Sequence, residues 1–409
     1  MASLSGKREQ ENTAMKEAQP NWRRFARLMA VFSYIGLIGF GGALGPIGLM
    51  ETSCVKRRHW LGSEAFQEGL VIATLFPGAT ALQLAVYIGS LYAGPLGGLL
   101  SGISFLLPAF LLMLSLSWLY VLYGTWPIIE AGFTWIGPVV VAIIMSTLYE
   151  MGRGSLKTLV HWSIGCLACL GVLFPIFPLF INLPIILLSC GVLGMILYGR
   201  GPSPPPPTKS SSPVTLHSFV MLPLAFQAFL EGVPPLLSLA VEFFKVGFLL
   251  FGCGFVMIPF LQQELVEHLH WLTTQQLLDG IALAQITPGP FLVVATFIGY
   301  KSAGIAGALT ATGAVFTPSF LLASVATPLL LRIRHSPRVK GFFQGVTPAV
   351  LGVLTASIVL LAQTTIIDGW TLGIAMISFS LLFLRRVHPA FLIGGALILG
   401  MLHVLVTPS

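Results

Sequence analysis

The sequence predicts an all-helical, polytopic membrane protein built from two homologous halves. The first observation behind this class is composition. Of the 409 residues, 56% are hydrophobic and 9% are charged, and the mean hydropathy is +0.91. Soluble domains carry about 25% charged residues, so this chain has too little polar surface to cover a water-soluble globule. Its apolar runs are long and continuous, which favours membrane helices over the short alternating segments of a β-barrel.

The second observation is an internal repeat. Phe40-Gly41 and Phe251-Gly252 each begin a glycine-rich stretch that is followed by a Trp, an acidic residue and a Pro-Gly pair. The corresponding residues are 211 positions apart: Trp60 and Trp271, Glu68 and Asp279, and Pro77-Gly78 and Pro288-Gly289. After a one-residue slip, the match continues at a spacing of 210, for example at Gly94 and Gly304. Two membrane halves that Gly and Pro interrupt at matching places are typical of transporters with a site at the repeat interface.

Composition also divides the chain into segments. Residues 1–22 are polar and lack the layout of a cleavable signal peptide, so they predict a soluble tail. Residues 200–218 begin with a Pro- and Ser-rich stretch that cannot form a packed helix, which predicts an exposed linker. This linker separates a first half at 23–199 from a second half at 219–409.

The loop charges predict that the two halves have inverted topology. Lys56-Arg57-Arg58 in the first half corresponds to a segment with Glu264 and Glu267 in the second, and two further pairs of matched loops also have opposite basic bias. Lys- and Arg-rich loops face the cytoplasm, so this bias places the halves upside down relative to each other. Basic residues stand both before the first apolar segment, at 23–27, and after it, at 56–58. A simple crossing would place these two clusters on opposite sides of the membrane, so the residues at 23–27 do not fit this scheme.

The net charge of +7 has the same origin. The basic residues form short clusters beside apolar runs, which is the pattern of membrane topology and not of nucleic-acid binding. We therefore expect the lipid bilayer as a partner and no nucleic acid. The oligomeric state is left open, with a homodimer as one candidate.

The glycine-rich stretches predict unwound backbone inside the membrane. Residues 39–46 contain four Gly and one Pro, so an uninterrupted helix is disfavoured there. Free N–H groups and positive helix ends would form an anion site, since non-helical backbone at membrane depth is tolerated only inside protein or along a polar cavity. The alternative is close helix packing through small residues. The substrate-binding candidates from these stretches are Phe40, Gly41, Gly42, Gly252 and Gly254.

The Pro-Gly pairs lie in the middle of apolar runs, where they predict a re-entrant hairpin or a broken helix. Polar residues accompany them, and amides in hydrocarbon need hydrogen-bond partners. These residues either line a substrate path or form interhelical hydrogen bonds. The candidates from these segments are Pro77, Gly78, Gln83, Gln285, Pro288, Gly289 and Pro290.

Three charged residues add further hypotheses. Glu68 and Asp279 are matched acids near the start of their runs, and a membrane acid is a candidate for proton coupling, although a solvated position at the interface is the alternative. Lys245 lies on an apolar helix one turn from Glu242, so it either pairs with that acid or faces an anion. No phosphate-binding loop, metal-ligand pattern or nucleophile-base pair is visible, so we expect no cofactor, no metal and no enzymatic activity.

At these residues the chain resembles the chromate ion transporter family in its long, two-domain form. The motifs that carry the resemblance are Phe40-Gly41-Gly42, Arg57-Arg58-His59-Trp60-Leu61, Phe76-Pro77-Gly78, Phe251-Gly252-Cys253-Gly254 and the run from Asp279 to Pro290. The first half departs from the family pattern at Thr74, where a Gln is common, and at Ala79, where a Pro is usual. The resemblance implies chromate export across the plasma membrane, with sulfate as a chemically similar oxyanion.

The favoured hypothesis is a secondary transporter that moves a tetrahedral dianion by alternating access, driven by membrane potential or a proton gradient. An importer or exchanger of sulfate or another oxyanion is the first alternative, because sequence does not give the direction of flux. A membrane sensor that transports nothing is the second.

Overall fold

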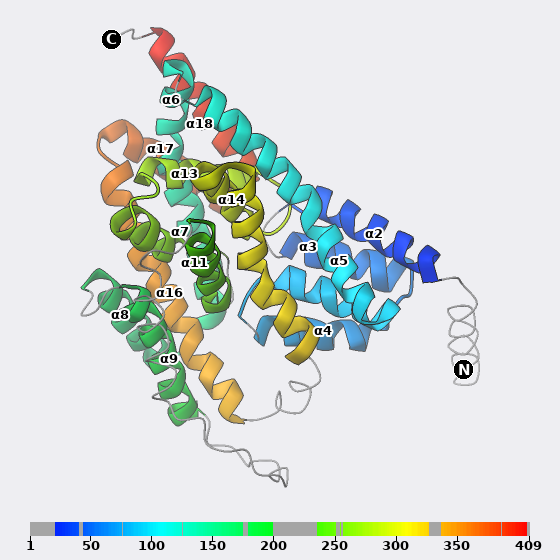
Figure 1. Cartoon of the computed structure of the whole chain (residues 1–409). Coiled ribbons are helices and arrows are strands. Elements are labelled where there is room, and N and C mark those ends of the chain that lie inside the picture. The colour runs from blue at the N-terminus through cyan, green and yellow to red at the C-terminus, as the bar shows by residue number, and fades with distance from the viewer. Residues whose placement is uncertain are drawn as a thin grey trace.

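The computed structural model describes residues 21–40, 44–75, 77–124, 126–174, 179–198, 235–250, 254, 257–326, 337–385 and 387–406. The secondary structure in these ranges is helical throughout, as the apolar composition predicts (Figure 1). Most of the expected tail, the whole of the expected linker, and Gly41, Gly42 and Gly252 lie outside the described residues. Four helices within these ranges are long and apolar enough to cross a membrane: Thr80–Tyr123, Ile128–Ser155, Phe291–Ser324 and Pro337–Thr365.

The two halves contain matching series of elements. The first half has α2 (Asn21–Ile38), α3 (Leu44–Met50), η1 (Glu51–Arg57), α4 (Ser63–Leu75), α5 (Thr80–Tyr123), α6 (Pro127–Thr134), α7 (Ile136–Ser155), α8 (Leu159–Leu173) and α9 (Leu179–Tyr198). The second half has α11 (Pro235–Leu249), α12 (Met257–Leu261), η3 (Gln262–His268), α13 (Thr274–Ile286), η4 (Phe291–Val293), α14 (Val294–Leu321), η5 (Leu322–Ala326), α16 (Pro337–Thr365), α17 (Gly369–Arg385) and α18 (Pro389–Val406).

Each Pro-Gly pair forms the tip of a helical hairpin. Helix α4 runs to the first tip, and the first arm of α5 (80–92) returns beside it, with Gly69 against the ring of Tyr87. In the second half, α13 runs to the tip and Gly280 packs against Phe297 in the returning segment. A 13-residue arm is about 20 Å long, which is shorter than the hydrocarbon core of about 30 Å. The expected Gly/Pro-broken or re-entrant segments are therefore present.

A second reversal follows each hairpin. Helix α5 is non-helical at Ala93 and Gly94, and the chain doubles back so that Ser101 donates a hydrogen bond to the Ala85 carbonyl at 2.7 Å. Helix α14 is interrupted at Ala303 and Gly304, and the hydroxyls of Thr296 and Thr312 bond at 2.8 Å across that turn. The long apolar segment of α5 is thus a short tip arm followed by a separate long helix (95–123).

The helices after the hairpins pack across the two halves. Helix α16 of the second half lies against α8 and α9 of the first, and α7 of the first half lies against α17 and α18 (Figure 1). Close approach is possible because small residues meet: Gly345 packs on the backbone of Cys190, and Gly352 on the backbone of Gly165. Large apolar side chains are exposed along the second arm of α5, as expected for a surface in contact with lipid tails.

Candidate functional site

The candidate site lies where the two hairpin tips meet. Gly78 donates its backbone N–H to the carbonyl of Leu250 at 2.5 Å, and Gly289 donates to the carbonyl of Gly39 at 3.0 Å. Gly78 and Gly289 are matched by the 211-residue repeat, as are Gly39 and Leu250. Each tip therefore binds the end of the helix that leads into the glycine-rich stretch of the opposite half. The two glycines have φ of +118° and +108°, a conformation that L side chains rarely adopt.

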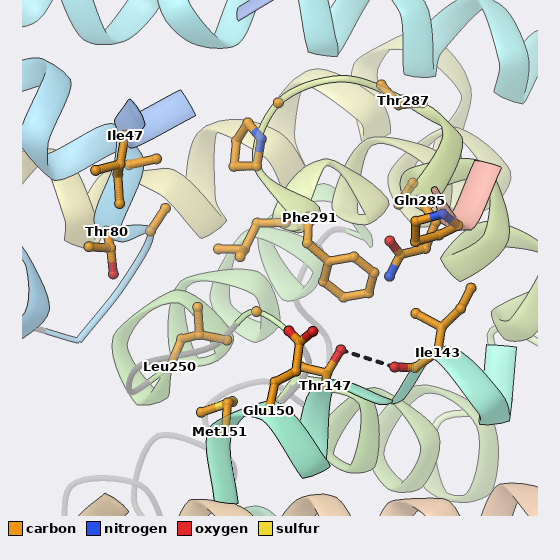
Figure 2. A pocket seen from close by; sticks show the side chains of 18 of the residues that line it. Ile47, Thr80, Ile143, Thr147, Glu150, Met151, Leu250, Gln285, Thr287 and Phe291 are labelled. Atoms are coloured by element: carbon orange, nitrogen blue, oxygen red, sulfur yellow. Dashed lines mark hydrogen bonds between the residues drawn. The ribbon is translucent and has the colours of Figure 1, made fainter. Parts of the chain in front are cut away.

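A cavity of about 920 Å³ lies beside both tips. The first tip contributes Gly78, Ala79, Thr80 and Ala81, and the second contributes Gln285, Thr287, Gly289 and Pro290. Helix α7 forms another wall with Ile143, Ser146, Thr147, Glu150 and Met151, and Figure 2 shows the Glu150 carboxyl directed into the cavity. His388 and Pro389, at the beginning of α18, also line the cavity.

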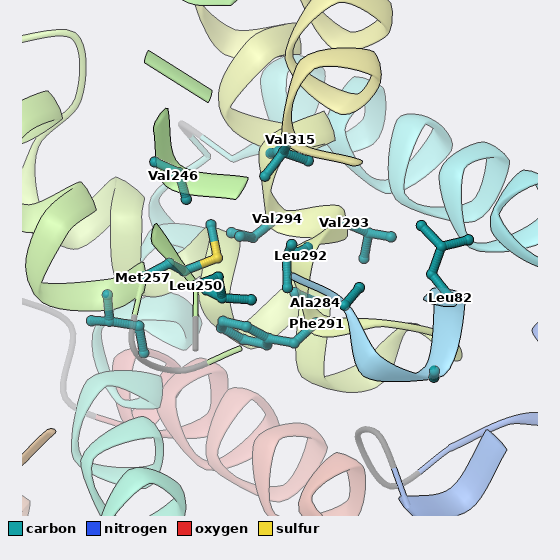
Figure 3. Close-up of a cluster of buried hydrophobic side chains, with 14 of the residues drawn as sticks. Leu82, Val246, Leu250, Met257, Ala284, Phe291, Leu292, Val293, Val294 and Val315 are labelled. Carbon is teal, nitrogen blue, oxygen red and sulfur yellow. The ribbon is translucent and has the colours of Figure 1, made fainter. Parts of the chain in front are cut away.

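An apolar cluster supports the second tip from behind. It includes Phe291, Leu292, Val293 and Val294, together with Val246 and Leu250 on the neighbouring segment (Figure 3). All of these side chains are at most 9% exposed. Burial of this cluster fixes the short segment after Pro290, and so fixes the backbone that faces the cavity.

Backbone electrostatics at the cavity favour an anion. Helix α5 begins at Thr80 and α18 begins at Pro389, and both residues line the cavity. The first turn of a helix leaves N–H groups without intrahelical partners and carries the positive end of the helix dipole. Two such ends at one cavity form an environment for negative charge.

Two side chains present polar atoms that have no partner. The Nε2 atoms of Gln285 and His388 are both buried without a hydrogen bond, and both residues line the cavity. The Nδ1 atom of His388 accepts the backbone N–H of Ala390 at 3.3 Å, so the proton of the neutral ring is on Nε2. Both Nε2 groups are therefore hydrogen-bond donors, which is the chemistry that an oxyanion requires.

Several predicted residues are at this cavity and others support it. Gly78, Gly254, Gln285, Gly289 and Pro290 line it. Pro77 and Pro288 belong to the tips, and Gln83 donates to the Pro77 carbonyl at 2.6 Å, so Gln83 braces the first tip. Phe40 packs the edge of its ring against His388, with centroids 5.6 Å apart.

The charged candidates lie away from the cavity. Lys245 bonds Glu242 at 2.6 Å, so of the two alternatives for Lys245 the structure shows pairing with the acid. Asp279 is 2% exposed and accepts hydrogen bonds from Tyr120 at 2.6 Å and Gln275 at 2.8 Å. Glu68 is half-buried on α4. None of the three is among the described residues that line the cavity.

Sequence reasoning missed Glu150 and His388. Glu150 lies next to a loop whose basic residues indicate membrane topology, and nothing in the pattern marks the acid. His388 is one of eight scattered histidines. Neither has a chemical counterpart at its repeat-related position, where Leu360 and Pro178 stand. The Pro at position 389 was the available signal, because the residue before a helix-initiating Pro is a capping position.

Comparison with known proteins finds a family model that matches two segments of the chain. The family model described as chromate transporter matches residues 26–195 and 237–401. A chromate transport protein of Cupriavidus metallidurans is 31% identical over 379 residues, covering 92% of each chain. A probable chromate transport protein of Synechococcus elongatus is 33% identical, covering 86% of this chain and 88% of the relative.

A shorter relative matches about one half. An uncharacterized transporter of Bacillus subtilis is 34% identical over 168 residues, which are 93% of its length and 40% of this chain. No solved structure matches the chain.

Proposed function

Because the chain belongs to the chromate transporter family, we propose that it exports chromate through the cavity between its two hairpin tips. Family membership makes the chain an integral membrane transporter and not an enzyme, and supports chromate transport. We further propose the direction of transport, its mechanism, its energy source and a location in the plasma membrane. The observation that carries the proposal is that one Pro-Gly tip from each half reaches the same cavity, beside two donors without partners.

The hydrogen-bonding groups that line the cavity suit a tetrahedral oxyanion. Such an anion accepts hydrogen bonds in several directions and carries no apolar group. The cavity offers Gln285, His388, the hydroxyls of Thr80 and Ser146, and two helix beginnings around it. Sulfate has the same shape and charge, so we expect it to compete for the site.

Unequal burial of two matched helices supports alternating access. On α7, Thr147 and Met151 line the cavity and are partly exposed. On α16, 210 positions later, Ser357 is 1% exposed and Leu361, which matches Met151, is also 1% exposed. If the halves are inverted, exchange of these two environments would close this cavity and form an equivalent one on the other side.

The membrane potential is sufficient to drive export. An inside-negative potential of about 100 mV contributes about 2.3 kcal/mol for each charge moved outward. Two charges give about 4.6 kcal/mol, which corresponds to roughly a thousandfold gradient. A proton gradient is the second energy source in the proposal, with Glu68 and Asp279 as coupling candidates.

The test is uptake of radiolabelled chromate by inside-out vesicles, with and without an imposed potential. We expect accumulation that depends on the potential and falls with excess sulfate. Accumulation only in right-side-out vesicles would favour an importer or exchanger. Absence of flux in both orientations, with folded protein present, would favour a sensor and contradict the proposal.

A further inference from the structure

The cavity has an uncommon balance of charge for an anion site. Among the described residues that line it, Glu150 and His388 are the titratable side chains, and no Lys or Arg is present. Arg385 and Arg386 precede His388 in the sequence, but their side chains lie outside the described part of the chain. Arginine keeps its charge at all relevant pH values, so neither residue would make anion affinity depend on pH.

His388 has one ring nitrogen in a hydrogen bond and one without a partner. Its Nδ1 atom accepts the Ala390 N–H, and the ring lies at the beginning of α18. Its Nε2 atom is buried and has no partner. An anion bonded to Nε2 would favour the protonated ring, because it attracts an imidazolium more strongly than an imidazole. Histidine is the side chain that ordinarily changes charge between pH 5 and 8.

Glu150, on α7, acts in the same direction. Its carboxyl is exposed on α7 and is directed into the cavity that His388 lines (Figure 2). An ionised carboxylate repels a dianion in the same cavity, whereas the protonated group does not. An oxyanion therefore favours the protonated form of Glu150 as well as the protonated form of His388.

We propose that oxyanion binding in this cavity is linked to proton uptake, with His388 as a direct ligand of the anion and Glu150 as the acid that must be neutral beside it. The inference rests on the proposed function and specifies how the same site is regulated. The pair has one residue from each half, and neither residue has a titratable counterpart, since Pro178 and Leu360 occupy the matched positions.

The test is calorimetric titration of the purified full-length protein with chromate between pH 6 and pH 8, in two buffers with different ionisation enthalpies. The difference between buffers gives the number of protons taken up for each anion bound. Chromate itself gains protons in this range, so all variants are compared with the wild type at the same pH. His388→Gln keeps a neutral donor, and we expect it to bind chromate about tenfold more weakly at pH 6 and to take up fewer protons. Glu150→Gln removes the repulsion, and we expect about tenfold tighter binding at pH 8, also with reduced proton uptake.

Matched controls separate these effects from general damage. His161→Gln changes a histidine outside the cavity that also has a buried Nε2 without a partner and an Nδ1 that accepts a backbone N–H, here from Lys157. Glu64→Gln changes an exposed acid on α4. Both controls should bind and take up protons as the wild type does. If His388→Gln does not yield monodisperse protein, His388→Asn decides, because Asn is a favourable residue at the beginning of a helix.

The outcomes are distinct. Wild-type proton uptake and affinity in both cavity variants would overturn the linkage and leave chromate transport standing. Absence of chromate binding by the wild-type protein at every pH would overturn the proposed function itself.

Discussion

The two hairpin tips share a backbone and differ in their side chains. Gly78 and Gly289 have similar positive φ angles and donate to matched carbonyls of the opposite half. Gln285 lines the cavity beside the second tip with a free amide, whereas the matched Thr74 uses its hydroxyl on the Val71 carbonyl at 2.9 Å. The repeat thus specifies the scaffold twice, while the two buried donors without partners at the cavity, on Gln285 and His388, both come from the second half.

The largest effect is expected from a change that breaks the shared backbone. In Gly289→Val, the new side chain is strained at positive φ, and a Cβ at this position would lie 2.8 Å from the Cβ of Ala109. We expect chromate flux in vesicles to fall more than about a hundredfold, since a small misplacement at a site can cost that much. Gly78→Val should have a similar effect if the tips are equivalent.

The control for these variants is Gly313→Ala, a helical position where nothing lies within 4 Å of a new Cβ. It should transport at the wild-type rate. Normal flux in Gly289→Val would remove the tip from the mechanism.

A second comparison concerns an ion pair that is present in one half only. Lys245 and Glu242 correspond to Tyr34 and Val31 in the first half. In Lys245→Ala, Glu242 stays 4% exposed without its counter-charge, so we expect a loss of about 2–3 kcal/mol of stability, measured by thermal or denaturant unfolding in detergent. The half-saturating chromate concentration should not change, because Lys245 lies outside the cavity.

Tyr34→Ala is the matched control. Tyr34 is 58% exposed, so its substitution should cost little stability. Weaker chromate affinity in Lys245→Ala would instead assign this lysine to the anion.

A third prediction tests the difference in side chains at the tips. Gln285→Leu removes a donor from the cavity, and we expect the half-saturating chromate concentration to rise about tenfold, as for loss of one hydrogen bond to a charged group. Thr74→Val should change it less than about twofold, because the Thr74 hydroxyl is already bonded to its own helix. Equal effects of the two substitutions would show that both tips contribute donors.

The smallest effect is expected at two matched helix caps. Thr158 caps α8 by accepting the N–H of His161, and Asp368, 210 positions later, accepts the N–H of Thr371 at 2.8 Å before α17. The backbone N–H of Thr371, followed by its hydroxyl, lowers the pKa of Asp368. A lowered pKa in the folded state adds stability above the unfolded value of about 3.9, and this stability is lost as pH falls through the folded value.

The folded protein with Asp368 should lose a small amount of stability as pH falls below about 4, and Asp368→Asn should not show this loss. Thermal unfolding at several pH values measures the difference. Thr158→Val should lower stability equally at every pH, since its hydroxyl does not titrate. An unchanged pH profile in Asp368→Asn would contradict the role of this carboxylate.

The hairpins were predictable because backbone requirements leave a sequence signal. Pro-Gly in an apolar run excludes a continuous helix, and its repetition at Pro77 and Pro288 indicates that both breaks have the same purpose. The side chains of the cavity were less predictable. Glu150 and His388 meet there only because α7 and the beginning of α18 pack across the two halves, and such long-range packing has no local pattern. Lys245 could be placed on its helix, but the choice between Glu242 and an anion needed the structure.

The reciprocal bonds from each tip to the opposite half have a consequence for the order of assembly. Gly78 cannot pair its N–H until Leu250 has been synthesised, and the partner of Gly289 is Gly39, near the other end of the chain. An unpaired N–H in hydrocarbon costs several kcal/mol, so an early insertion of the first tip would be unfavourable. Contacts between such distant residues also form slowly. We therefore expect both tips to enter the bilayer late, as one cooperative step after the second half has left the ribosome.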